Sequence, residues 1–197
     1  MYYAKVDTRA VATVRDLSRT GMRVVDVGVT LEFDARFDGS TVIPADVVVR
    51  DCLPDDVDTV LDIAGSCFRY SRFHVDPDVP RTIAHRIKRE WIANYVRGER
   101  GEQLLVARRD ERLVGFLAMM SLHEADRRIR VIDLIGVDSA HQGQGVGRAL
   151  VASFLDATAA SEGRRVATQA SNIPSLGLYQ RFGFRVIRTG YVLHMHV

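Results

Sequence analysis

Apolar residues recur along the 197-residue chain in two spacings, and these predict alternating strands and helices. Alternating or continuous apolar residues predict strands, whereas apolar residues three or four positions apart predict helices. Strands are expected at 2–6, 22–33, 45–50, 103–108, 112–120 and 130–137. Helices are expected at 8–19, from Pro54 onward, at 81–97 and at 149–160. The chain then ends in a predicted strand from 165, a helix around Tyr179 and a strand that begins near Phe184.

The two helices in the middle of the chain have clear apolar faces. Pro54, Asp55 and Asp56 favour a helix start, because proline fits the first turn and carboxylates favour the positive end of the helix dipole. The apolar face that follows consists of Val57, Val60, Leu61, Ala64 and Phe68. In the second helix the expected face consists of Ile83, Ile87, Trp91, Ile92 and Tyr95.

The first forty residues resemble the end of the chain. Sliding the sequence by 162 positions aligns Gly21 with Gly183, Arg23 with Arg185, Val24 with Val186, Gly28 with Gly190 and Leu31 with Leu193. We interpret residues 1–40 as a degenerate partial copy of the final strand-helix-strand unit, added at an edge of the sheet; coincidence between two similar amphipathic units is the alternative. The polar connector at 34–44 is the best boundary, so residues 45–197 form the second predicted domain.

Composition and charge mainly exclude classes of function. The chain has 27 basic and 25 acidic residues and a net charge of +2, so neither nucleic acid nor an anionic membrane is indicated as a partner. Cys52 and Cys67 are too few for a disulfide framework and lack metal-ligand spacing, so we expect both to pack as small apolar residues. Because the sequence contains no leader peptide and no apolar run of ~20 residues, the prediction is a cytoplasmic protein.

A glycine-rich stretch lies where a predicted strand passes into a predicted helix. Gly143, Gly145 and Gly147 follow the strand, and Arg148 comes next. Glycine permits a sharp turn, and the first N–H groups of a helix have no partner within the helix. The helix dipole is also positive there, so the stretch suits a phosphate or pyrophosphate. A glycine-rich turn without a ligand is the alternative.

The spacing in this stretch selects among phosphate loops. The Rossmann pattern G-x-G-x-x-G fails, and the Gly-Lys-Ser/Thr of a Walker loop is absent. The pattern Q-x-x-G-x-G is present in Gln142, Gly145 and Gly147. In this respect the sequence resembles the GNAT superfamily of acetyl-CoA-dependent N-acetyltransferases, whose pyrophosphate loop has that pattern.

A second motif further along the chain strengthens the resemblance. It consists of Asn172 after a strand, then Leu178 and Tyr179 on a helix, then Gly183 and Phe184. The two motifs follow the order and separation that are typical of GNAT proteins. The resemblance implies an α/β fold with a mixed, largely antiparallel sheet flanked by helices, to which the N-terminal strand-helix-strand unit is added.

The same resemblance implies acetyl-CoA as co-substrate, and no metal. The backbone of Ile135, Gly136 and Val137 would hold the thioester and the pantetheine arm, and Asn172 would hydrogen-bond the pantetheine chain. Glycine inside a strand often marks a bulge or a close approach, and Gly136 suits such a strand. The pyrophosphate would lie on Gln142, Gly143, Gln144, Gly145, Val146, Gly147 and Arg148.

Tyr179 is the candidate catalytic residue. A phenol with a reference pKa of about 10 stays protonated at neutral pH and can donate to the departing thiolate of CoA. The alternative is a helix tyrosine whose ring lies in the core. The general base that accepts the proton of the acceptor amine stays open among His123, Glu124, Asp133, His194 and His196.

An aromatic and basic segment, 68–77, is the candidate acceptor loop. Arg69, Tyr70, Arg72 and Phe73 are candidate substrate contacts, because aromatic rings stack on a sugar or base and arginine pairs with phosphate; a solvated loop pinned to the core is the alternative. This loop and segments near 91–98 and 165–169 are similar to bacterial TDP-fucosamine acetyltransferases. That similarity implies transfer of acetyl to a small-molecule amine, and specifically to a nucleotide-linked amino sugar.

Two other functions remain open at this point. One is a peptide or protein N-acetyltransferase, and the other is a non-catalytic acyl-CoA-binding module. The acceptor's identity and the oligomeric state also stay open, with a homodimer as one alternative.

Overall fold

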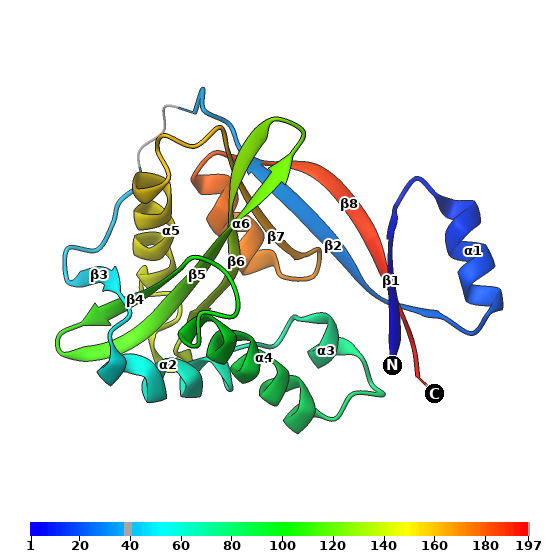
Figure 1. Cartoon of the computed structure of the whole chain (residues 1–197), viewed down its shortest axis with the longest axis horizontal. Coiled ribbons are helices and arrows are strands. Elements are labelled where there is room, and N and C mark those ends of the chain that lie inside the picture. The colour runs from blue at the N-terminus through cyan, green and yellow to red at the C-terminus, as the bar shows by residue number, and fades with distance from the viewer. Residues whose placement is uncertain (38–40, 197) are drawn as a thin grey trace.

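The computed structural model describes residues 1–37 and 41–196, and its centre is one eight-stranded sheet in the order β1-β8-β2-β7-β6-β5-β4-β3 (Figure 1). Neighbouring strands pair antiparallel except β6 and β7, which pair parallel. The mixed, largely antiparallel sheet of the predicted α/β class is therefore confirmed. The strands are β1 (Tyr2–Asp7), β2 (Arg23–Phe33), β3 (Val47–Asp51), β4 (Gln103–Arg109), β5 (Arg112–Glu124), β6 (Arg127–Val137), β7 (Gly163–Gln169) and β8 (Phe184–Met195).

Helices cover both faces of the sheet. The α-helices are α1 (Val11–Arg19), α2 (Val57–Ala64), α3 (Arg72–Val75), α4 (Arg81–Val96), α5 (Val146–Ala157) and α6 (Ile173–Arg181). Two short 3-10 helices, Pro54–Asp56 and Ser139–His141, precede α2 and α5. Within the described ranges, none of the helices has the length and apolar character needed to cross a bilayer.

Alternating side chains of the central strands pack into two separate hydrophobic cores, one on each face of the sheet. On one face, Leu117 and Met119 of β5 pack with α5 and α6. On the other face, Phe116 and Ala118 of the same strand pack with α2 and α4. This alternation follows from the period of two along a strand, and it fixes which helices lie on which side.

The N-terminal unit is built into the sheet. β2 lies between β7 and β8, so the expectation that this unit is added at an edge is wrong for β2, although β1 does form an edge. Gly28 of β2 lies directly opposite Gly190 of β8, the same pair that a slide of 162 positions aligns. β1, α1 and the end of β8 enclose a small third core around Val6, Met22 and Leu193.

The division into domains at 1–40 and 45–197 stays a prediction. The connector between the two includes residues 38–40, which lie outside the described residues. Hydrogen bonds join the ranges closely, because β2 has one partner strand on each side and both partners belong to 45–197.

Two local features differ from the sequence prediction. Residues 72–75 form the short helix α3 inside the expected acceptor loop, and the β5–β6 hairpin is longer than expected, with its last pair at Glu124 and Arg127. The half-buried, unbonded Cys52 and Cys67 pack against the α2–α4 core, as predicted.

Candidate active site

The site begins where β6 parts from β7. The parallel ladder joins Ile129–Ile132 to Gly163–Val166, and no further pairs follow among the described residues, although β6 runs on to Val137 and β7 to Gln169. An extra residue, Asp133, also interrupts the pairing of β6 with β5, because Ile132 faces Met119 and Leu134 faces Ala118. In the part of the chain that the structure describes, the β7 side of residues 133–137 therefore has no strand partner.

Gly136 lies in this unpaired stretch at a close approach. A Cβ atom at this position would lie 2.6 Å from Cε1 of Phe116 and 2.8 Å from Sγ of Cys67. Any side chain at position 136 would therefore displace Phe116 and Cys67 in the core beneath α2 and α4. The neighbours Ile135 and Val137 are half-buried and pack against the opposite core, next to α5.

The glycine loop that follows β6 is a chain of free N–H groups. Among the residues that the structure describes, none accepts a hydrogen bond from the backbone N–H of residues 143–147. Gly143 and Gly145 have φ values of +75° and +89°, a conformation that favours glycine, and Gly145 is the N-cap of α5. Five consecutive donors at the positive end of a 12-residue helix have the chemistry that suits an anion.

Side chains fix the shape of this loop. Gln142 donates its Nε2 hydrogen bond to the carbonyl of Val137 at 3.0 Å, and Gln144 donates to the carbonyl of Ala140 at 2.9 Å. Arg109 of β4 donates to the side chain of Gln144 at 2.6 Å. Gln142 and Gln144 thus brace the turn. The loop surface at Gly143 and Gln144 is exposed, so it is open to a ligand.

Gly145 has neighbours on two sides. A Cβ atom there would lie 2.4 Å from Cγ of Pro44 and 2.9 Å from Nη2 of Arg148. The guanidinium of Arg148 therefore lies against the turn, and its positive charge adds to that of the helix end. Near the start of α5, a Cβ atom at Gly147 would lie 3.2 Å from Cδ2 of Leu178 in α6.

Tyr179 of α6 is buried on the α5 side of the sheet. Its side chain is 2% exposed, and its ring lies 5.9 Å from that of Phe184. Burial raises the pKa of the hydroxyl above its ordinary value, so the phenol stays protonated throughout the neutral range. The ring therefore contributes to the core, and its hydroxyl is available only as a proton donor near neutral pH.

Asn172 has a structural role at the start of α6. Its side-chain oxygen accepts a hydrogen bond from the backbone N–H of Ser175 at 3.3 Å, which makes it the N-cap. The oxygen is used in this way, whereas the amide NH2 group of the same side chain has no acceptor among the described residues. The NH2 group is therefore available to a ligand.

The four predicted acceptor residues separate into two kinds. Arg69 and Tyr70 lie at the surface. Phe73 is 6% exposed and packs near His194, with 6.2 Å between ring centroids, so burial favours a packing role for it. Arg72 is half-buried, with its guanidinium carbon 4.0 Å from the ring centroid of Tyr3 in β1. The short helix α3 turns the side chains of Arg72 and Phe73 toward β1 and β8.

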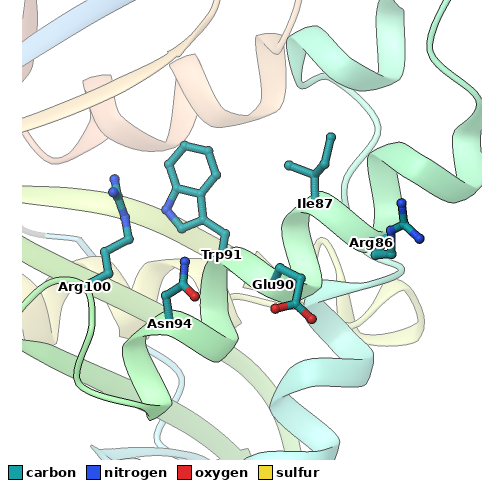
Figure 2. Close-up of a pocket in the computed structure, with 6 residues that line it drawn as sticks. All are labelled: Arg86, Ile87, Glu90, Trp91, Asn94 and Arg100. Carbon is teal, nitrogen blue, oxygen red and sulfur yellow. The ribbon is translucent and has the colours of Figure 1, made fainter. Parts of the chain in front are cut away.

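A pocket of about 340 Å³ lies beside α4 and the loop that follows it, and Figure 2 shows its lining. Trp91, Ile87 and Arg100 project to the same side of the helix in this view. The complete lining is Arg86, Ile87, Glu90, Trp91, Asn94 and Arg100, so none of the four predicted acceptor residues belongs to it.

Asp133, the extra residue of β6, is the centre of a hydrogen-bond network at this pocket. Arg100 donates to its two oxygens at 2.7 and 2.9 Å. Nε1 of Trp91 and the hydroxyl of Tyr95 each donate to Oδ2 at 2.8 Å. Burial acts to raise the pKa of Asp133, but the hydrogen bonds from Arg100, Trp91 and Tyr95 outweigh it and hold the pKa below its ordinary value.

The structure narrows the list of general bases. Asp133 accepts from three side chains and is therefore a poor proton acceptor. Glu124 binds Arg165 at 2.6 Å at the tip of the β5–β6 hairpin, next to the exposed His123. His194 and His196 both contact Oδ2 of Asp76, at 2.5 and 2.9 Å, and His194 is 1% exposed.

Lys88 is a candidate residue that the sequence pattern did not reveal. It lies on the innermost stripe of α4 with Ala84, Ile92 and Tyr95, and it is 6% exposed. The predicted apolar face of this helix includes Ile83 and Ile87, which are only half-buried, and it does not include Lys88. One feature of the sequence does indicate Lys88. It lies four positions from both Ala84 and Ile92, at a spacing where an amphipathic helix has apolar residues.

Comparison with protein families places most of this fold, including the glycine loop, within one family. The chain belongs to the acetyltransferase (GNAT) family, whose model matches residues 57–184. The matched range includes the unpaired end of β6, the glycine loop and Tyr179, and it indicates an acyltransferase.

Two curated relatives are similar to the chain. The spore coat polysaccharide biosynthesis protein SpsD of Bacillus subtilis is 27% identical over 144 residues, which are 72% of this chain and 48% of that protein. Human N-acetyltransferase 8B is 31% identical over 107 residues, 52% of this chain and 47% of that protein. The match to this chain thus spans about half the length of either relative.

Two solved structures support the fold. A GCN5-related N-acetyltransferase from Kribbella flavida has a TM-score of 0.64 at 16% identity, covering 97% of this chain and 66% of that one. Another, from Sphaerobacter thermophilus, has a TM-score of 0.63 at 14% identity, covering 97% of this chain and 58% of that one.

Proposed function

We propose that the protein is an acetyl-CoA-dependent N-acetyltransferase that acts on a primary amine of a small molecule. The observation that carries this proposal is the row of free N–H groups at 143–147, which directly follows the unpaired end of β6. Free donors at a helix end suit a diphosphate, and an unpaired strand edge suits an extended amide-bearing arm. CoA contains both chemical groups in one molecule.

Each part of the site has a role in this proposal. The backbone of Ile135–Val137 aligns the pantetheine arm, and the NH2 group of Asn172 donates to it. Residues 142–148 bind the pyrophosphate, with the charge of Arg148 against the turn. Bound acetyl-CoA supplies an acyl thioester, and the acceptor amine attacks its carbonyl carbon directly. Holding the two reactants in position supplies much of the rate acceleration in reactions of this kind.

Tyr179 acts as the general acid in this proposal. Its hydroxyl donates a proton to the sulfur as the carbon–sulfur bond breaks, so that free thiol leaves instead of thiolate. The acceptor nitrogen loses one proton to solvent as the amide forms, and the phenolate of Tyr179 takes one proton back from solvent, which balances the step. The burial that raises the pKa of Tyr179 supports the role, because it keeps the proton on the phenol until the sulfur needs it.

A nucleotide-linked amino sugar is the acceptor class that we favour. The name of the B. subtilis relative refers to polysaccharide biosynthesis, and the match covers most of this chain. Arg69 lies at the surface and Arg72 is half-buried on the α3 side, where they are available to the phosphates of such an acceptor.

A thiol-release assay tests the function. The chain is incubated with acetyl-CoA and a panel of nucleotide amino sugars, polyamines and amino-acid amides, and free CoA thiol is measured. We expect release with at least one small-molecule amine and the strongest release with a nucleotide amino sugar. Release with peptide amines alone would indicate a protein N-acetyltransferase. Binding of acetyl-CoA without release on any amine would indicate a non-catalytic module.

Asn172 offers a test of the pantetheine contact that separates it from the capping role. Asn172→Asp keeps the capping oxygen, so the free energy of unfolding should stay within about 0.5 kcal/mol of the wild type. The change removes the NH2 donor, so affinity for acetyl-CoA in calorimetry should fall about tenfold. As a control, Asn172→Ala should also lose about 1 kcal/mol of stability, because it removes the cap as well. Unchanged affinity in the aspartate variant would exclude the contact.

A further inference from the structure

Lys88 is a buried cation with no ion-pair partner among the described residues. Its ammonium lies over two aromatic rings, 5.1 Å from the centroid of Phe68 and 4.7 Å from that of Trp91. Cation–π contacts offset part of the cost of burying an ammonium group, but they do not neutralise the charge. The negative charge of Asp133 favours the charged form of Lys88, but that carboxylate is already paired with Arg100. Within the described chain, Lys88 forms no ion pair of its own.

A second cation near Lys88 is also incompletely satisfied. The charge of Arg72 acts on Lys88, and Nη1 of Arg72 is buried with no hydrogen-bond acceptor in the described part of the chain. The remaining positive group that acts on Lys88, Arg100, is neutralised by Asp133. Among the described residues, the ammonium of Lys88 and Nη1 of Arg72 therefore each lack an oxygen that accepts a hydrogen bond.

The location of Lys88 connects it to the proposed transfer site. The ring of Phe68, over which the ammonium lies, packs edge to face with that of Phe116, with 6.3 Å between the ring centroids. Cε1 of Phe116 would in turn lie 2.6 Å from a Cβ atom at Gly136 in β6. Trp91, on whose ring the ammonium lies, lines the pocket of about 340 Å³ in Figure 2. The unpaired charge thus lies between the strand that aligns the thioester and a pocket on the α4 side.

We propose that Lys88 binds an anionic group of the acceptor, a carboxylate or a phosphate, and so selects amines that bear a negative charge. This inference rests on the proposed acetyl transfer, because it assigns the α4 side of β6 to the acceptor. It names a recognition residue outside the segment 68–73, and it explains why a lysine occupies the innermost stripe of an otherwise apolar helix face.

The ionisation of Lys88 gives the recognition a pH dependence. Burial lowers the pKa of Lys88 to about 8; the carboxylate of Asp133 opposes that shift, and the charges of Arg72 and Arg100 add to it. Cys67 stays a neutral thiol because burial raises its pKa to about 12, and His74 stays neutral near pH 8 because burial lowers its pKa to about 4. The charged form of Lys88 is present below about pH 8, so anion binding should weaken as the pH rises through that value.

The composition of the chain makes a direct test practical, because Lys5 and Lys88 are the only lysines in the sequence. Lysine labelled with ¹³C at Cε should give two side-chain signals, and the exposed Lys5 on β1 serves as the internal control. The protein is first saturated with desulfo-CoA, which occupies the glycine loop, and is then titrated with inorganic pyrophosphate. We expect the Lys88 signal to move and its pKa to rise, while the Lys5 signal stays in place. A Lys88 signal that does not respond would overturn the proposal.

Kinetics on matched acceptors supplies the second readout. An amino sugar and its phosphate ester are compared in wild type, Lys88→Met, Lys88→Arg and the control Lys5→Met. We expect Lys88→Met to raise the KM for the phosphate ester about 10- to 100-fold, with kcat and the neutral sugar little changed, because one charge-assisted contact is lost. Lys88→Arg should restore part of the affinity. An equal loss on both acceptors would contradict anion recognition and would indicate a role in folding or proton transfer.

The two proposals fail in different ways. If no amine releases thiol, acetyl transfer itself is wrong. If thiol is released but wild type does not distinguish the phosphate ester from the neutral sugar, acetyl transfer holds and the anion site at Lys88 is wrong.

Discussion

Tyr179→Phe is expected to lower turnover by about 10²–10⁴-fold while acetyl-CoA still binds, because the change removes the only proton that this side chain can offer to the departing sulfur. Phenylalanine preserves the ring, which is buried among core residues and packs against Phe184. The free energy of unfolding should therefore change little. The measurement is steady-state thiol release with an accepted amine, together with calorimetry of acetyl-CoA.

The pH profile gives an independent readout for the same residue. A general acid works in its protonated form, and burial raises the pKa of Tyr179 above the ordinary value of a phenol, about 10. Turnover of the wild type should therefore show no decline from tyrosine ionisation below about pH 10. If Tyr179→Phe turns over at the wild-type rate, the tyrosine has no part in the mechanism and its role is only to pack.

Gly145→Ala is expected to lower the affinity for acetyl-CoA about 100-fold and to destabilise the fold by about 2 kcal/mol. The stability loss arises because Gly145 has a φ of +89°, which an L-residue adopts only at a cost. The affinity loss arises because the new methyl group would lie 2.4 Å from Cγ of Pro44, so the turn must move and the positions of its N–H groups change. Calorimetry with acetyl-CoA and chemical denaturation measure the two effects.

A second glycine supplies the matched control for this change. Gly98, after α4, has a φ of +72° and would meet no atom within 4 Å if it had a Cβ. Gly98→Ala should therefore show a similar stability loss without the loss of affinity. Equal affinity in Gly145→Ala and in wild type would mean that the glycine loop is not the pyrophosphate site.

Local motifs were the part of this site that the sequence predicted well. The glycine spacing at 143–147 and the strand, Asn172 and helix order around Tyr179 are encoded in consecutive residues, and the structure forms a loop, a capped helix and a return strand from them. The fold class followed from the same motifs through the resemblance to a family. The cofactor roles of these residues stay predictions.

Long-range pairing and isolated polar residues were the part that could not be predicted. The position of β2 between β7 and β8 depends on hydrogen bonds between residues far apart in sequence, which periodicity does not report. Lys88 is one charged residue in an apolar stripe, and only the folded structure brings its ammonium over aromatic rings. The helix α3 is four residues long, too short for a periodic signal.

The place of β2 in the sheet has a consequence for biosynthesis. Residues 23–33 are synthesised early, whereas both strands that flank them in the sheet, β7 and β8, are the last of the eight to be made. During translation this early segment has no partner strand, and unpaired strands slow folding and can associate with other chains. The nascent protein thus depends on its last strands to complete the sheet, and a ribosome that stalls before them would leave β1 and β2 without a partner strand.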